Sequence, residues 1–310
     1  LKRVRAKKLR NQGIKGESLE QGADRHGEKA HPNWWILGGS LIFVLFTLIM
    51  GLSRVSYNQE SVFAGSMSIV IFLMAKLLKE LSPSARRTLV GTALVSFVFR
   101  ALPGPGAGAT WWQIDELGFD QQFTSTLSLV GGGLALLGMF IFRRFMVEKS
   151  IAYVVGFLTI IGSVLSLPII GMYYGLHEWT AGLTSGLVDA RFIAIVDTAL
   201  ESPLGQVAMI PMLAWIANSA PSHLKATFFA VMASFTNLAL SLSNLGTKYL
   251  NRIFTVSRQI LEPLSGAATV PADYSELGIM LITVTSLGLL LPLLTIFLIH
   301  KSPLRSPRKL

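Results

Sequence analysis

The sequence predicts an all-α, polytopic membrane protein with about eight transmembrane helices. Composition is the first reason: 51% of the 310 residues are hydrophobic and 14% are charged, whereas soluble domains carry about 25% charged residues. The second reason is that the apolar residues gather into eight segments near the length of about 20 residues that a helix needs to cross the hydrocarbon layer. A single water-soluble core could not enclose so much apolar surface, so the lipid bilayer is the first expected partner.

The expected spans follow one another from residue 34 to the end of the chain. The third is short because Pro103 and the glycines around it end the helix. The sixth is long and contains charged residues, so its assignment depends on its neighbours more than on its hydropathy. The eight segments are residues 34–53, 61–78, 88–102, 122–142, 151–174, 187–216, 224–248 and 277–299.

Basic residues predict the orientation of these spans. If residues 1–33 are cytoplasmic, the alternating loops place 21 Lys and Arg inside and five outside, with Arg100 within a span. Cytoplasmic loops are usually the ones enriched in Lys and Arg. We therefore expect a multi-pass protein of a cell (inner) membrane, with an even number of spans and both termini cytoplasmic.

The net charge of +10 is concentrated near the start of the chain, where residues 1–33 hold nine Lys and Arg without apolar periodicity. A solvated segment beside anionic lipid headgroups is favoured over a nucleic-acid-binding arm, and we expect no nucleic-acid partner. Four regions are expected: a basic cytoplasmic tail or loop (1–33), two transmembrane helices that end an N-terminal half (34–81), a six-helix transmembrane bundle (82–300) and a basic cytoplasmic tail (301–310).

Aromatic doublets lie at the predicted ends of the spans. Amphipathic rings favour the membrane interface, so interfacial belts are preferred here over core packing. The residues concerned are Trp34 and Trp35 at the inner side, and Trp111, Trp112, Tyr173, Tyr174 and Trp179 at the outer side.

Several chemistries find no support in the sequence. The chain has no cysteine, which excludes disulfides, thiolate metal sites and cysteine nucleophiles. His177 and His223 are isolated, and no metal-site spacing, HExxH, GxSxG or P-loop is present. We expect no metal and no cofactor. The first residue is Leu1, which suggests a fragment or a processed chain.

Ionisable residues at membrane depth are costly and usually face a cavity or a partner. Asp197 and Glu201 are spaced i,i+4, so both carboxylates lie on one helix face. Two adjacent carboxylates can share a proton, which suits a proton-coupling site. Pro203 and Pro211 are expected to interrupt the helix and free backbone carbonyls near Gln206.

A structural explanation of these acids remains open at this point. Arg100 lies in the outer half of the third span, and Arg191 lies near the start of the sixth. In this alternative, one of the two arginines neutralises Asp197 or Glu201 and fixes the packing of the helices.

The seventh span carries a regular polar stripe. Its side chains recur at intervals of three, four and three residues, which keeps them on one helix face. Such a stripe either lines a wet cavity or bonds a neighbouring helix. Cavity lining is favoured, because two carboxamides and a lysine exceed what packing requires. The stripe consists of Ser234, Asn237, Ser241 and Asn244, and Thr227 and Lys248 extend it by seven and four residues.

Small residues in the fourth span favour close packing. Gly131, Gly132, Gly133, Ala135 and Gly138 would let helix backbones approach each other.

Residues 195–250, IVDTALESPLGQVAMIPMLAWIANSAPSHLKATFFAVMASFTNLALSLSNLGTKYL, resemble helices ten and eleven of folate/biopterin transporters in the major facilitator superfamily. FRALPGPGAGATWWQIDELGFDQQF (99–123) resembles helix seven and its outer loop, and a weaker likeness extends over residues 89–299. The family pattern of a deep Asp, then Pro, then a turn and a helix with a polar Asn is matched by Asp197, Pro211, Pro221, Ala226, Thr227 and Asn237. His223 and Lys225 depart from it, since the family usually has Gly and Glu there, and this leaves the solute open.

The resemblance implies that the first two spans are helices five and six, that the other spans complete the twelve, and that four helices are missing before Leu1. It implies a secondary active carrier for a small organic anion such as a folate or pterin, coupled to protons. Arg100, Asn237, Ser241 and Asn244 would then bind the solute, and Asp197 and Glu201 would carry the proton.

Two other functional classes are alternatives to a transporter. Asp197-x-x-x-Glu201 faintly resembles the Mg²⁺ motifs of membrane prenyltransferases, which need a second acidic motif. The later acids, Glu262, Asp273 and Glu276, all lie in one loop, so an enzyme is not expected. A non-transporting structural membrane subunit is the third class.

Overall fold

The computed structural model describes residues 34–53, 55–219, 225–261 and 268–304. They divide into two compact units, residues 1–41 and 42–310. All contacts discussed below lie within the second unit. The basic stretch 1–33, most of the tail 301–310, Arg54, Pro221, His223 and Glu262 lie outside the described residues.

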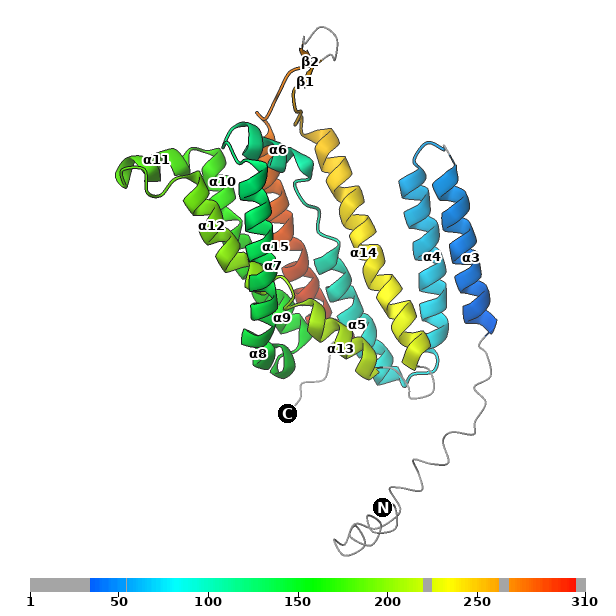
Figure 1. Ribbon diagram of the computed structural model, residues 1–310. Helices are drawn as coiled ribbons and strands as arrows, with labels where there is room; N and C mark the ends of the chain where they lie inside the picture. The colour runs from blue at the N-terminus through cyan, green and yellow to red at the C-terminus, as the bar shows by residue number, and fades with distance from the viewer. Residues whose placement is uncertain (1–33, 54, 220–224, 262–267, 305–310) are drawn as a thin grey trace, which may run out of the picture. The chain divides into compact units, whose positions relative to one another are not determined.

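Helices make up most of the described chain (Figure 1). A two-stranded antiparallel ribbon, which was not expected, lies between the last two long helices. The elements are α3 (Trp34–Leu52), α4 (Asn58–Leu78), α5 (Pro83–Arg100), α6 (Ala107–Asp115), α7 (Gln121–Ile141), α8 (Arg143–Glu148), α9 (Ile151–Leu165), α10 (Leu167–Tyr173), α11 (Leu176–Leu183), α12 (Ala190–Glu201), the 3-10 turn η2 (Ser202–Leu204), α13 (Met209–Ser219), α14 (Lys225–Ile253), β1 (Ile260–Leu261), β2 (Ala268–Val270) and α15 (Leu277–Lys301).

Within the described ranges, seven helical stretches are long and apolar enough to cross a membrane, and each coincides with an expected span. The remaining expected span is α5, whose three arginines, Arg86, Arg87 and Arg100, keep it out of the apolar set. The prediction of a polytopic helical membrane protein is confirmed. The seven are Trp34–Leu52, Asn58–Leu78, Gln121–Ile141, Ile151–Tyr173, Ala190–Asn218, Lys225–Ile253 and Leu277–Lys301.

Helix α14 packs against α4, α5 and α13, while α5 also packs against α9 and α15 (Figure 1). One face of α14 is buried, through Phe228, Met232, Phe235 and Ala239 among others. Elsewhere large apolar side chains are exposed, as at Leu129 and Phe140 of α7. Extensive exposed apolar surface is what lipid-facing helices present.

The break in the sixth span lies against glycines of α7. Gly138 is buried against the backbone of Pro203 and has no room for a Cβ atom, whereas a Cβ atom at Gly131 would displace the Ser202 hydroxyl. Close packing was expected from this glycine run, and these two positions show it. Gly132 and Gly133 instead face open space.

The sixth span is interrupted at Pro203 but not at Pro211. Helix α12 ends at Glu201, and Pro203 lies in η2. Pro211 lies in the first turn of α13, where a missing backbone N–H costs little. The Gln206 carbonyl accepts a hydrogen bond from the Ile210 N–H at 3.4 Å. Pro211 therefore does not interrupt the span, and the expectation of a second interruption was wrong.

We call the end of the bundle that carries α6 and residues 254–261 and 268–276 the ribbon end. Trp112 is 5% exposed there, and its ring centroid lies 5.7 Å from that of Tyr173. Trp112 was expected at the membrane interface, but it packs in the core of the bundle. Tyr174 and Trp179 are exposed, as an interfacial belt requires.

Candidate functional site

The polar stripe of α14 is turned away from the packed face of that helix. Ser234, Asn237 and Asn244 are exposed and Ser241 is partly exposed, while the opposite face is buried. The amide of Asn244 has no hydrogen-bond partner within the described ranges, and the hydroxyl of Ser241 has none either. We call Ser234, Asn237, Ser241 and Asn244 the α14 stripe.

Arg100 lies beside the middle of this stripe. Its Nη2 is 3.5 Å from Oδ1 of Asn237, at the long end of the hydrogen-bond range. Its Nε is buried and has no hydrogen-bond partner among the described residues. The structure thus brings together two predicted binding residues and leaves part of the guanidinium available to another group.

Arg100 is held there because α5 ends at this depth and the chain continues without helical structure to α6. This segment, residues 101–106, runs along α14 and bonds to it three times. Ser243 Oγ donates to the Leu102 carbonyl at 2.6 Å, Thr247 Oγ1 accepts from the Gly104 N–H at 2.9 Å, and Asn251 Nδ2 donates to the Pro105 carbonyl at 3.4 Å. Irregular backbone at membrane depth needs such protein partners.

Sequence reasoning missed this second polar face of α14. Ser243, Thr247 and Asn251 recur every four residues, and that spacing was a usable signal. Gly106 adopts a left-handed conformation with φ of 72° close to Asn251, where a side chain would be strained.

Lys248, which extends the stripe, is paired with a residue that sequence reasoning had not considered. Its Nζ lies 2.8 Å from Oε1 of Glu60, in the first turn of α4. The Tyr249 hydroxyl donates to the same oxygen at 2.8 Å. Oε2 of Glu60 is buried and has no hydrogen-bond partner among the described residues. This contact links α4 to the stripe at the ribbon end.

Asp197 and Glu201 both lie on α12, as expected. Oδ1 of Asp197 is buried and has no hydrogen-bond partner within the described ranges, and Glu201 is exposed. Helix α12 packs on α7, α9, α10 and η2. Among the described residues, no hydrogen bond or ion pair joins these acids to Arg100 or Asn237, so the structure does not assemble all the predicted site residues into one contact network.

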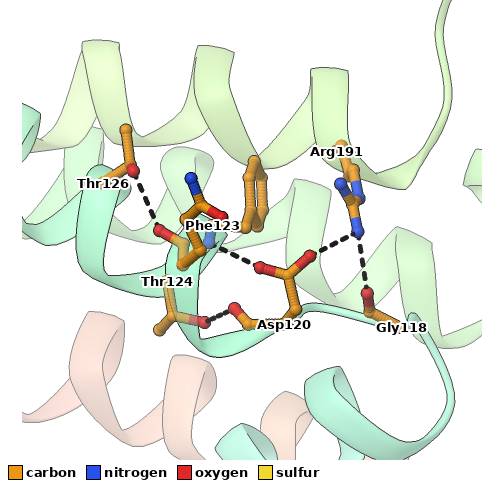
Figure 2. A network of polar contacts seen from close by, with 7 residues as sticks. Gly118, Asp120, Phe123, Thr124, Thr126 and Arg191 are labelled. Carbon is orange, nitrogen blue, oxygen red and sulfur yellow. Dashed lines mark hydrogen bonds and ion pairs between the residues drawn. The ribbon is translucent and has the colours of Figure 1, made fainter.

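Arg191 is engaged elsewhere, as Figure 2 shows. Its Nη2 lies 3.0 Å from Oδ2 of Asp120 and 3.1 Å from the Gly118 carbonyl, and its guanidinium lies 5.2 Å from the centre of the Phe123 ring. Asp120 also accepts from the Phe123 N–H at 2.7 Å and so caps α7. That backbone bond, followed by Arg191, holds the pKa of Asp120 below its usual range.

Neither arginine neutralises Asp197 or Glu201 among the described residues, so a purely structural ion pair with these acids is not seen. Arg191 pairs with Asp120, and Arg100 contacts Asn237. Asp189, at the start of the same span, caps α12 by accepting from the Phe192 N–H at 2.8 Å.

The acids of the ribbon end form structural contacts. Asp115 accepts from the Tyr274 hydroxyl at 2.6 Å and pairs with Arg258 at 2.9 Å. The bond from Tyr274, and then that from Arg258, lowers the pKa of Asp115, while burial raises the pKa of Tyr274 to about 12. Glu276 accepts from the Thr255 N–H. In the described part of the chain, no three His, Asp or Glu residues gather as metal ligands would.

Comparison with known proteins shows which family the chain resembles. Residues 66–306 match the BT1 family. A "Folate-biopterin transporter" of Synechocystis sp. is 26% identical over 208 residues, which cover 67% of this chain and 38% of that protein. "Putative folate transporter 2" of Plasmodium berghei is 26% identical over 161 residues, 52% of this chain and 34% of that protein.

The chain thus spans less than half the length of either relative. No solved structure is significantly similar to it. The family match covers most of the chain, and the matched residues form a bundle of membrane-spanning helices. The chain belongs to the BT1 family of folate-biopterin transporters in the major facilitator superfamily, a family of transporters and not of enzymes.

Proposed function

We propose that this chain carries a small organic anion of the folate or pterin type across a membrane, as a secondary active transporter. The observation that carries the proposal is Arg100 beside Asn237, with a buried and unbonded Nε next to an exposed polar stripe. A cation and two carboxamides at membrane depth are costly unless they serve a cavity or a solute. The names of both relatives, which refer to folate, support the same solute class.

Solute binding is assigned to Arg100, Asn237, Ser241 and Asn244. The guanidinium provides charge and paired donors for a carboxylate or for a ring carbonyl. The carboxamides can both donate to and accept from a pteridine ring, whose edge alternates donors and acceptors. Carriers of this superfamily bind solute near the midplane and alternate access by rocking, and no cofactor is needed.

Proton coupling is assigned to Asp197 and Glu201. Two carboxylates on one helix face with no cationic partner among the described residues can take up and release a proton. Since no described contact joins them to Arg100, coupling would act through movement of the break at Ser202–Leu204 and not by direct contact with the solute.

The ribbon end is assigned to the outer side, with both termini inside and the protein in a cell membrane. Charge supports this orientation. Three of the five Lys and Arg counted outside are neutralised by ion pairs: Arg191 with Asp120, Lys248 with Glu60, and Arg258 with Asp115.

Uptake by reconstituted vesicles tests the function. The full chain should accumulate labelled folate or biopterin above protein-free vesicles, and more strongly with an inward proton gradient. Asp197→Asn should keep the fold and abolish the response to the gradient. Unchanged pH dependence in Asp197→Asn would refute the coupling role.

A non-transporting membrane subunit is the remaining alternative. It predicts a folded, vesicle-inserted chain without accumulation of any labelled folate or pterin under either gradient. Binding of folate without uptake would place the chain between the two, as the solute-binding part of a transporter.

A further inference from the structure

We propose that Lys248 is a second anion-binding residue of the solute path, that Glu60 occupies it in the absence of solute, and that the carboxylate tail of a folate displaces Glu60. This inference rests on the proposed function and specifies it: the preferred solutes are folates, which have a glutamate tail, in preference to pterins that have no carboxylate.

The first support is the position of Lys248. It lies 11 residues after Asn237 on the same helix, close to three full turns, so it lies on the side of α14 that carries the stripe. At 1.5 Å per residue the two positions are about 16 Å apart along the helix axis. Arg100 at Asn237 and Lys248 therefore place two cations along one polar surface, with Ser241 and Asn244 between them.

The second support is that Lys248 already holds a carboxylate. Glu60 Oε1 lies 2.8 Å from its Nζ, a distance typical of a charge-assisted hydrogen bond. The Lys248 side chain remains 29% exposed, so water and a solute can reach it. The Glu60 carboxylate therefore shows the position in which the carboxylate of a solute would bind Lys248.

The third support is that Glu60 is incompletely bonded. Lys248 and Tyr249 both bond Oε1, while the buried Oε2 has no partner among the described residues. A carboxylate with one unsatisfied oxygen is easier to replace than one bonded on both. After displacement Glu60 can keep the Tyr249 hydroxyl, and its return would help to release the solute.

The geometry fits the two ends of a folate. An extended folate has a pteridine ring at one end, an aminobenzoyl group in the middle and two carboxylates at the other end. The ring would lie at Arg100 and Asn237, and the tail would reach Lys248. Exchange of one carboxylate for another keeps the charge near Lys248 balanced, which avoids leaving a partly buried ammonium without a partner.

Equilibrium binding of labelled folate and labelled biopterin to the purified full chain in lipid nanodiscs tests the proposal. Glu60→Gln removes the competitor and should tighten folate binding several-fold. Lys248→Gln should weaken folate binding about tenfold, the loss expected for a charge-assisted hydrogen bond. Biopterin binding should change by less than about twofold in both variants, because biopterin has no carboxylate to bond Lys248. The double variant should behave as Lys248→Gln does.

Arg258→Gln provides the matched control. It breaks another ion pair of the ribbon end, with Asp115, that includes no residue of the α14 stripe, and it should leave the affinity for both solutes unchanged. Retained biopterin binding shows that each variant is folded. Equal shifts for folate and biopterin, or folate binding unaltered by Glu60→Gln, would overturn the inference alone. Failure of the wild-type chain to bind either solute would overturn the proposed function and this inference with it.

Discussion

The two polar faces of α14 have similar residue types and different surroundings. Ser243, Thr247 and Asn251 bond the backbone of residues 102–105. Asn237 and Asn244, on average about one fifth of a turn away, are exposed. A polar side chain in a membrane helix either satisfies protein backbone or serves something that is not protein, and its partners distinguish the two cases.

Arg100→Gln should produce the largest change, because it removes the charge from the exposed face. We expect folate affinity to fall about 10- to 100-fold, the range for loss of a hydrogen bond to a charged group. Thermal stability should remain close to that of the wild type, since the bond from Nη2 to Asn237 is long, at 3.5 Å, and the Nε has no partner among the described residues. Binding isotherms and melting curves on the same preparations measure both quantities. An unaltered affinity would remove Arg100 from the binding face.

Thr247→Val should show the opposite profile. The change is nearly isosteric and leaves the Gly104 N–H without its acceptor, which should cost about 1 kcal/mol, as for hydrogen bonds between membrane helices. We expect a Tm lower by a few degrees and an unchanged folate affinity. Ser241→Ala is the matched control, since no described partner is lost: its Tm should hold while folate affinity weakens. A reversed pattern would mean that the two faces have been assigned the wrong way round.

Gly131→Ala should have a smaller effect, on stability, which tests how α7 packs against the break in the sixth span. An added Cβ atom would lie close to the Ser202 hydroxyl, which can rotate away, so we expect a loss of stability of about 1 kcal/mol. Gly132→Ala, at a position facing open space, should be neutral or slightly stabilising because alanine favours helix. Urea or thermal unfolding of both variants provides the comparison, and equal values would contradict the described packing of α7.

Acid should loosen the ribbon end slightly. Asp115 has a lowered pKa, chiefly because of the Tyr274 hydroxyl. Its contribution to stability is therefore present above the pKa of the unfolded chain and is lost as pH falls through the lower, folded value, at pH values below about 4. Fluorescence of the buried Trp112 during acid titration reports this change. Asp115→Asn should have the looser state at neutral pH and lose this part of the acid response.

Hydropathy was sufficient to predict most of the spans, because a helix that crosses the bilayer is mainly apolar over its thickness. Segment 151–174 became α9 and α10 together, and segment 224–248 became most of α14. The short helices α6 and α11 and the ribbon were not predicted, since their positions depend on tertiary contacts such as Trp112 with Tyr173. Residue type and spacing placed Asn237 and Asn244 on one exposed face correctly.

Pairing between distant residues could not be predicted from the sequence. Glu60 and Lys248 are separated by most of the chain, and Arg191, one of two candidate partners for Asp197 or Glu201, pairs with Asp120. Charge alone does not select a partner, because the sequence offers several acids to each arginine. Arg191 on α12 meets Asp120 because α12 packs against α7, whose N-terminus Asp120 caps.

The contact of Gly138 with the backbone of Pro203 has a mechanical consequence. A carbonyl packed against a helix at a position without a side chain leaves no room for the two segments to slide past each other, so we expect α7 and the interrupted span to move together as one rigid unit. Flexing would then be confined to the chain on either side of this joint, at residues 205–208 before α13 and at the entry to α7. A side chain at Gly138 would clash with the Pro203 backbone and should force α7 and the interrupted span apart.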